Sequence, residues 1–72
     1  MSTIPKDEPV EFIRLGVVKA LTSLGTTKIY TMINEGNFPR QVPIGGRSVA
    51  WVKSEVLAWN RAQVEKARKP KA

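Results

Sequence analysis

Apolar positions repeat at helical spacing in the first part of the chain. From Leu15 to Leu24, the residues Val17, Val18 and Leu21 recur with the period of a helix, which predicts a first helix over this range. The polar residues that follow this stretch predict a tight turn over 22–25 into a second helix. Two short helices joined by a few residues that include glycine are typical of a helix-turn-helix, and also of an ordinary helical corner in a small bundle.

The second helix is predicted within Leu24–Phe38. Gly25 is an acceptable residue at its start, and Gly36 stands where a left-handed C-cap would end it, with Pro39 preventing a return to helix. The positions Ile29, Met32 and Ile33 fall at i, i+3 and i+4, and they are therefore expected to form its buried face.

The opposite face of this second helix is polar but almost uncharged. It carries Thr27, Thr31 and Asn34, flanked by Lys28 and Tyr30. Small groups that donate and accept hydrogen bonds suit the major groove of DNA, where base edges and the thymine methyl group are exposed. A polar helix face without a binding role is the alternative, and this stretch alone leaves both interpretations open.

After Pro39 the period of the pattern changes to that of strands. Val42 and Ile44 alternate with polar or proline positions, Val49 and Trp51 alternate with Ser48 and Ala50, and Gly45-Gly46-Arg47 separates the two runs. This pattern predicts a β-hairpin with Gly46-Arg47 at the centre of a type II′ turn, in which the strand containing Pro43 lies at an edge. An arginine at such a tip favours a wing that contacts DNA phosphates over a hairpin that only covers the core.

A third helix is predicted from Lys53 to Lys69. Its apolar stripe runs through Val52, Val56 and Trp59 and continues over Gln63 and Ala67. We expect Trp51 and Trp59 to lie in the core. Before the first helix, residues 11–14 are predicted to be extended, residues 1–10 to form a disordered arm, and residues 70–72 to form a basic tail.

Length, composition and net charge limit the classes of function that this chain can have. The chain has 72 residues, which predicts one domain (residues 11–69) with little room for a deep catalytic pocket. It contains no Cys and no His, and its six carboxylates form no recognisable catalytic or metal-binding spacing, so we expect neither an enzyme nor a metal or other cofactor. A net charge of +6 favours an anionic partner, with nucleic acid ahead of a membrane surface. No apolar run approaches membrane-spanning length, which predicts a cytoplasmic protein.

Several of these segments together resemble one family. Thr26-Thr27-Lys28-Ile29-Tyr30, Ile33-Asn34-Glu35-Gly36-Asn37-Phe38-Pro39, Pro43 to Trp51, Ser54-Glu55-Val56 and Trp59 resemble the AlpA-type regulators of prophages and genomic islands. The resemblance covers about Leu15 to Trp59. Gly25, in place of the usual Ser or Thr at the helix start, and Gly16, in place of a longer polar residue, depart from the family pattern.

The resemblance implies a winged helix-turn-helix similar to MerR DNA-binding modules and to phage excisionases, mainly α with a small β-hairpin. It implies a sequence-specific binder of double-stranded DNA that regulates transcription, often of an integrase gene, or acts as a recombination directionality factor. An integrase and further copies of the protein on DNA are candidate partners. The expected contacts from the recognition helix are Thr26, Thr27, Lys28, Tyr30 and Thr31, and those from the wing and the backbone-binding surface are Arg40, Gly46, Arg47, Ser48 and Lys53.

A rival interpretation comes from a different class. The chain could be a protein-interaction module that binds an integrase or a host enzyme, with its positive charge serving solubility. DNA binding with a strong salt dependence would separate the DNA-binding interpretation from this rival.

Overall fold

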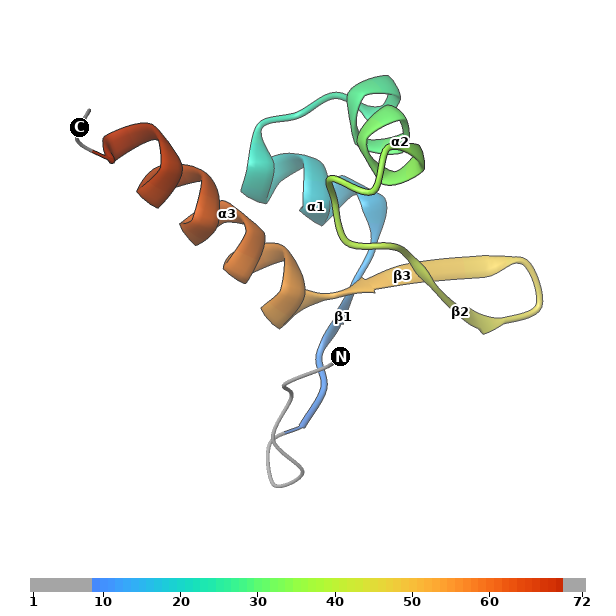
Figure 1. The fold of residues 1–72 in the computed structure, drawn as a ribbon. Helices are drawn as coiled ribbons and strands as arrows, with labels where there is room; N and C mark the ends of the chain where they lie inside the picture. Colours follow the sequence, from blue (N-terminus) through green and yellow to red (C-terminus); the bar gives the residue numbers. More distant parts are fainter. Residues whose placement is uncertain (1–8, 70–72) are drawn as a thin grey trace.

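The computed structural model describes residues 9–69, which form three helices and three short strands (Figure 1). In chain order the elements are β1 (Phe12–Ile13), α1 (Leu15–Thr22), α2 (Thr26–Asn34), β2 (Val42–Gly45), β3 (Ser48–Val52) and α3 (Lys53–Arg68). The predicted basic tail, and all but the last two residues of the predicted N-terminal arm, lie outside the described residues. Two helices followed by a hairpin and a third helix make a winged helix-turn-helix, and this prediction is confirmed.

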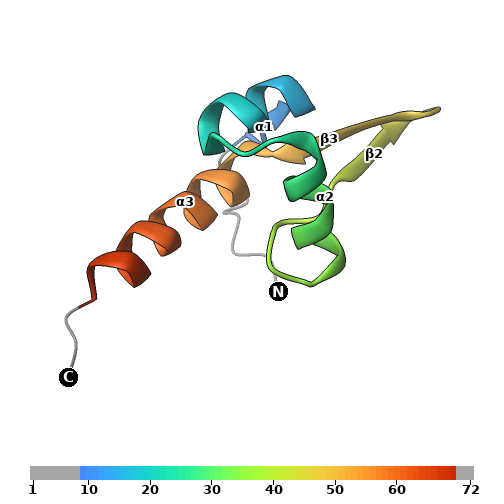
Figure 2. The same cartoon turned by 90° about the horizontal axis from the view of Figure 1, so that it is seen from above.

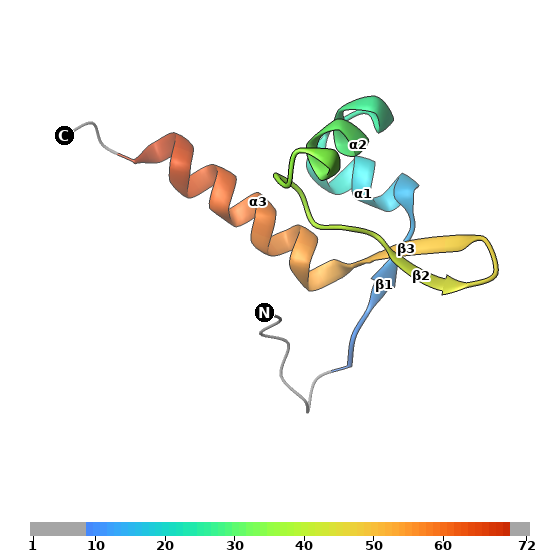
Figure 3. The ribbon, with the colours of Figure 1, turned by 45° about the vertical axis from the view of Figure 1, so that its right-hand side comes forward.

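The strands form one antiparallel sheet in the order β1-β3-β2. The predicted hairpin is present, but the sequence did not indicate that the extended segment before α1 pairs with β3, where Ile13 lies opposite Trp51. Figures 2 and 3 show that the hairpin projects from one side of the molecule and α3 from the other. The helices α1 and α2 lie between them, on the same side of the sheet (Figure 1).

The alternation predicted for β3 is wrong at Ala50, which is fully buried together with its neighbour Trp51. Ala50 lies opposite Val42, and Val52 lies opposite Phe12, so these four side chains share the sheet face that points away from Trp51. On that face the cross-strand neighbour of Ala50 on β2 is therefore apolar. Phe12 remains 49% exposed there.

The first helix is shorter than predicted. α1 ends at Thr22, and the following Ser23 adopts the left-handed conformation (φ 62°) and donates its backbone N–H to the Lys19 carbonyl. The Thr22 hydroxyl donates to the Val18 carbonyl (2.8 Å) and accepts from the Leu24 N–H (3.3 Å), so it stabilises the turn. Of the apolar residues whose spacing predicted this helix, Val18 is fully buried and Val17 is 46% exposed.

Both predicted ends of α2 are close to the observed ones. Gly25 is the N-cap in ordinary extended conformation, and it provides no side-chain cap. At the other end Gly36 has φ 79°, its N–H bonds to the Ile33 carbonyl (3.0 Å), and the Asn37 N–H bonds to the Met32 carbonyl (2.8 Å). These two bonds make a Schellman motif, which satisfies carbonyls that the helix end leaves free.

The core lies where α1, α2, β3 and α3 meet. Its largest fully buried side chains are Trp51, Ile29, Val18 and Val56. Ile33 is also buried and Met32 is half-buried, which confirms the buried face predicted for α2. Trp59 is half-buried and packs against this cluster.

The third helix begins as predicted and ends one residue earlier, at Arg68. Its apolar stripe was predicted to reach Ala67, but Ala67 is exposed and only residues up to Gln63 are half-buried or buried. The reason is visible in Figures 1 and 3, where the C-terminal part of α3 extends beyond the rest of the fold.

Two tryptophans hold the segment that follows α2. The indole N–H of Trp51 donates to the Pro39 carbonyl (3.1 Å), and that of Trp59 donates to the Asn37 carbonyl (2.7 Å). Between these carbonyls the Phe38 side chain is buried, and its ring meets the Trp59 ring edge-on with centroids 4.9 Å apart. Such aromatic pairs contribute about 0.5–1.5 kcal/mol beyond their buried area. The C-terminal end of α2 is therefore attached both to the sheet and to α3.

Replacing Gly25 by serine is expected to stabilise the fold. Gly25 has backbone angles that any residue adopts, and a Cβ there would meet no atom within 4 Å. A serine hydroxyl could accept an N–H of the first turn of α2, and the unfolded chain would lose entropy. We expect a gain of about 0.5–1 kcal/mol in the free energy of unfolding, measured by urea denaturation.

The matched control is Gly36→Ser. This position also has open space around it, but its φ is 79°. A side chain is strained in that conformation, so we expect a loss of roughly 1 kcal/mol. Equal effects of the two serines would contradict the cap assignments.

Candidate nucleic-acid interface

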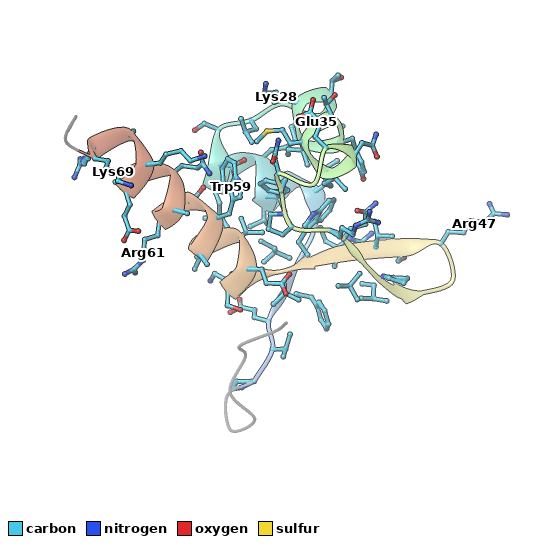
Figure 4. All side chains as sticks on the ribbon, in the orientation of Figure 1. Lys28, Glu35, Arg47, Trp59, Arg61 and Lys69 are labelled. Carbon is cyan, nitrogen blue, oxygen red and sulfur yellow. The ribbon has the colours of Figure 1, made fainter. Side chains whose placement is uncertain are left out.

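The outer face of α2 is an exposed and nearly uncharged surface. Because Ile29 and Ile33 point into the core, Thr27 and Thr31 on the opposite side of the helix point outward. Of the five residues predicted to contact DNA from this helix, four are exposed, namely Thr26, Thr27, Lys28 and Thr31. Figure 4 shows Lys28 and Glu35 at the top of the molecule, on the side away from the sheet.

Tyr30 is the fifth predicted residue, and it has a second role. Its side chain is half-buried, packs on the core, and meets Trp51 edge-on with ring centroids 6.2 Å apart. The ring therefore helps to fix α2 on β3. Only part of the side chain remains for a contact with DNA.

The hairpin tip has the predicted geometry. Gly45 pairs with Ser48, which leaves Gly46 and Arg47 as the two loop residues. Gly46 has φ 52° and Arg47 has a negative φ, as the backbone of a type II′ turn requires. The register shifts between Pro43 and Gly45, which marks a bulge in β2 next to the tip.

Arg47 projects from the far end of the hairpin, away from all other elements (Figure 4). Within residues 9–69 the one ion pair joins Lys53 and Glu11, so the positive charge of Arg47 is not neutralised by a described carboxylate. The hairpin therefore presents a cation, with glycine backbone beside it. Ser48, at the start of β3, is half-buried.

The two remaining predicted cations occupy different environments. Arg40 is exposed and follows Pro39, whose carbonyl binds Trp51, so its backbone is fixed next to the end of α2. Lys53 lies at the opposite end of β3 from the tip, about 20 Å from Arg47 along the strand direction. Its ammonium is 3.6 Å from Glu11 Oε2, so the structure does not bring Lys53 together with the other predicted residues.

In the described part of the chain, the exposed cations outside the sequence-based set are Arg14, Lys19, Arg61, Lys66, Arg68 and Lys69. Arg14 follows β1 and precedes α1, and the pairing of Ile13 with Trp51 places it on the hairpin side of that pair, level with Ala50. The signal that could have identified it is the β1–β3 pairing, which is non-local and was not predicted.

Within residues 9–69, no three or more His, Cys, Asp or Glu side chains gather as a metal site would require. None of the described helices is long and apolar enough to cross a membrane.

The geometry defines a winged helix-turn-helix with a polar second helix and a basic wing. The sequence matches, over residues 11–64, the family described as Prophage CP4-57 regulatory protein (AlpA), and this protein belongs to that family of prophage regulatory proteins. It is also 39% identical over 61 residues to an uncharacterized protein, ORF88, of Enterobacteria phage P4. That match covers 85% of this chain and 69% of the phage protein. The family match includes every residue predicted to contact DNA.

The two roles of Tyr30 can be separated by substitution. Tyr30→Phe keeps the ring against Trp51, and no described residue bonds to its hydroxyl. We therefore expect a change in unfolding free energy below about 0.5 kcal/mol, while Tyr30→Ala should cost about 2–4 kcal/mol. Urea denaturation gives both values. If Tyr30→Ala melted like the parent, Tyr30 would not be part of the core.

Proposed function

We propose that this protein is a sequence-specific double-stranded DNA-binding regulator of a prophage or genomic island. The observation that carries this proposal is the pairing of two features on one scaffold. The outer face of α2 is exposed and nearly uncharged, and the hairpin beside it carries an unneutralised arginine at its tip. Family membership supports the same function.

In this proposal α2 enters the major groove. A helix with its side chains is about 10–12 Å across, close to the roughly 12 Å width of that groove. Thr27 and Thr31 lie four residues apart and project from one face. Each offers a hydroxyl to a base edge and a methyl group to thymine, and Lys28 suits the acceptors of guanine. Thr26 lies at the N-terminal end of the same helix and would contact DNA there.

The cations around α2 would hold the phosphate backbone. Arg47 and the backbone of Gly46 and Ser48 would contact it from the wing, and Arg40 would contact it beside the end of α2. Tyr30 and Lys53 stay as predicted phosphate contacts, and the charge of Lys53 is shared with Glu11.

The biological role that we propose is that of an excisionase, a regulator of an integrase gene, or both. Neither role needs covalent chemistry by this chain. Several copies on one site could bend the DNA so that an integrase assembles in the excisive arrangement. The protein would act on DNA in the bacterial cytoplasm.

A second candidate function rests on exposed apolar side chains. Val10, Phe12 and Ile44 are each more than 40% exposed, and such side chains often mark contacts with other proteins. In this alternative the domain would bind an integrase or a host enzyme without reading DNA itself.

The decisive experiment is a footprint combined with a salt titration. We expect protection of a defined site in the DNA that flanks the gene for this protein or the attachment sites of its element. The logarithm of the binding constant should fall linearly with the logarithm of salt concentration, with a slope of about −0.9 per phosphate contact. DNA binding that is weak, unspecific and insensitive to salt would favour the protein-interaction alternative.

Arg47→Ala should weaken specific and non-specific binding about equally. The arginine lies at a glycine-rich tip, where a phosphate contact is expected rather than a base contact. Losing one such contact should reduce the magnitude of the salt slope by about one unit. Titrations at four salt concentrations measure this slope, and an unchanged slope in a folded variant would remove the hairpin from the interface.

Thr31→Ala should show the opposite pattern. The side chain is exposed, so its loss should leave the fold intact. We expect it to cost about 1–3 kcal/mol of discrimination between the true site and a single-base variant, with non-specific binding nearly unchanged. Paired titrations of the two duplexes at one salt concentration provide the test. Equal losses on both duplexes would make Thr31 a backbone contact.

A further inference from the structure

The second helix is attached to the rest of the fold mainly through its side chains. Among the described elements, α2 is the one whose backbone lies close to other helices and strands over the shortest stretch. Its attachment consists of its buried side chains, the edge-on contact of Tyr30 with Trp51, and the segment that follows its C-terminal end. A change in the position of the segment 35–39 should therefore change the orientation of α2.

Two neighbouring residues of α3 hold the C-terminal ends of both helices of the helix-turn-helix. The Trp59 indole N–H donates to the Asn37 carbonyl just beyond α2 (2.7 Å). The Asn60 side-chain amide donates to the Leu21 carbonyl (3.0 Å), one of the last carbonyls of α1, which have no partner within their own helix. One turn of α3 thus fixes where α1 and α2 end relative to each other.

From these contacts we infer that Trp59 and Asn60 are positioning residues for sequence reading, although neither lies on the proposed DNA-binding face. This inference rests on the proposed function. α3 sets the angle at which α2 is presented beside the hairpin. Figure 4 shows Trp59 on the side of α3 that faces the other helices, below the segment that carries Lys28.

A small rotation of α2 about its C-terminal end should affect discrimination between DNA sequences more than overall affinity for DNA. The helix has 9 residues and is about 13 Å long, so a turn of about 5° around its C-terminal end moves its N-terminal end by about 1 Å. Hydrogen bonds to base edges tolerate a range of only about 0.5 Å in distance. Thr26 and Thr27 lie at the far end of this lever, where the displacement is largest. Phosphate contacts by long flexible side chains adapt to the same displacement.

The test is Trp59→Phe, which keeps an aromatic ring against Phe38 but removes the N–H donor together with part of the ring system. We expect binding to the true site to weaken by about three- to tenfold, which is the fold-change of one lost hydrogen bond. Binding to a scrambled duplex should change by less than about twofold. Asn60→Ala, which removes the donor to Leu21, should also weaken binding to the true site more than binding to the scrambled duplex.

Val52→Ala is the matched control. It truncates a buried side chain on the sheet face that points away from Trp51, at the start of α3, so it lowers the melting temperature and leaves the hydrogen bonds of Trp59 and Asn60 in place. Its ratio of specific to scrambled binding should equal that of the parent. Unchanged discrimination in Trp59→Phe would overturn the inference. An equal loss of discrimination in Val52→Ala would also overturn it, because general destabilisation would then be the cause.

A second readout does not depend on DNA. In ¹⁵N–¹H correlation spectra of the free proteins, the amide signals of residues 26–31 should shift in Trp59→Phe and stay in place in Val52→Ala. Unmoved signals in Trp59→Phe would refute the positioning role. Shifted signals in a protein that binds no DNA would leave the positioning role intact and refute the proposed function instead.

Discussion

The arrangement of this small domain depends on how the short segment after α2 is held. Two indole N–H groups, from Trp51 on the sheet and Trp59 on α3, bind the carbonyls of Pro39 and Asn37 on either side of the buried Phe38. These contacts matter in a domain near the lower size limit, because a small core alone supplies little stability. The same side chains provide apolar packing and satisfy backbone groups that would otherwise lack partners.

Because the core holds one face of α2 and the ends of both short helices, the opposite face is free for binding. The threonines on that face are not needed for packing, and neither is the arginine at the hairpin tip. A family of regulators could therefore change the bases it reads by changing exposed residues on a constant scaffold. In the positioning role that we infer for them, Trp59 and Asn60 limit this freedom, since they bond to the C-terminal ends of the two short helices.

Local signals in the sequence predicted most of the fold. Gly36 and Pro39 marked the end of α2, and Gly45-Gly46 marked the hairpin turn, because each of these residues acts on its own backbone. Features that depend on distant partners were not predictable in this way. The pairing of β1 with β3 places Arg14 level with Ala50, and the bond from Trp59 to Asn37 spans 22 positions. The residues of the candidate interface could thus be named from the sequence as a prediction, while the contacts that orient α2 could not.

The most direct test of the account is a map of amide chemical shifts during titration with the duplex identified by footprinting. The account predicts that the largest changes occur together in residues 26–31 of α2 and at the hairpin tip, residues 45–48. The exposed C-terminal part of α3 and the face around Phe12 should change little. Shifts confined to Val10, Phe12 and Ile44, or to the end of α3, would contradict the central claim that α2 and the hairpin form the DNA-binding surface.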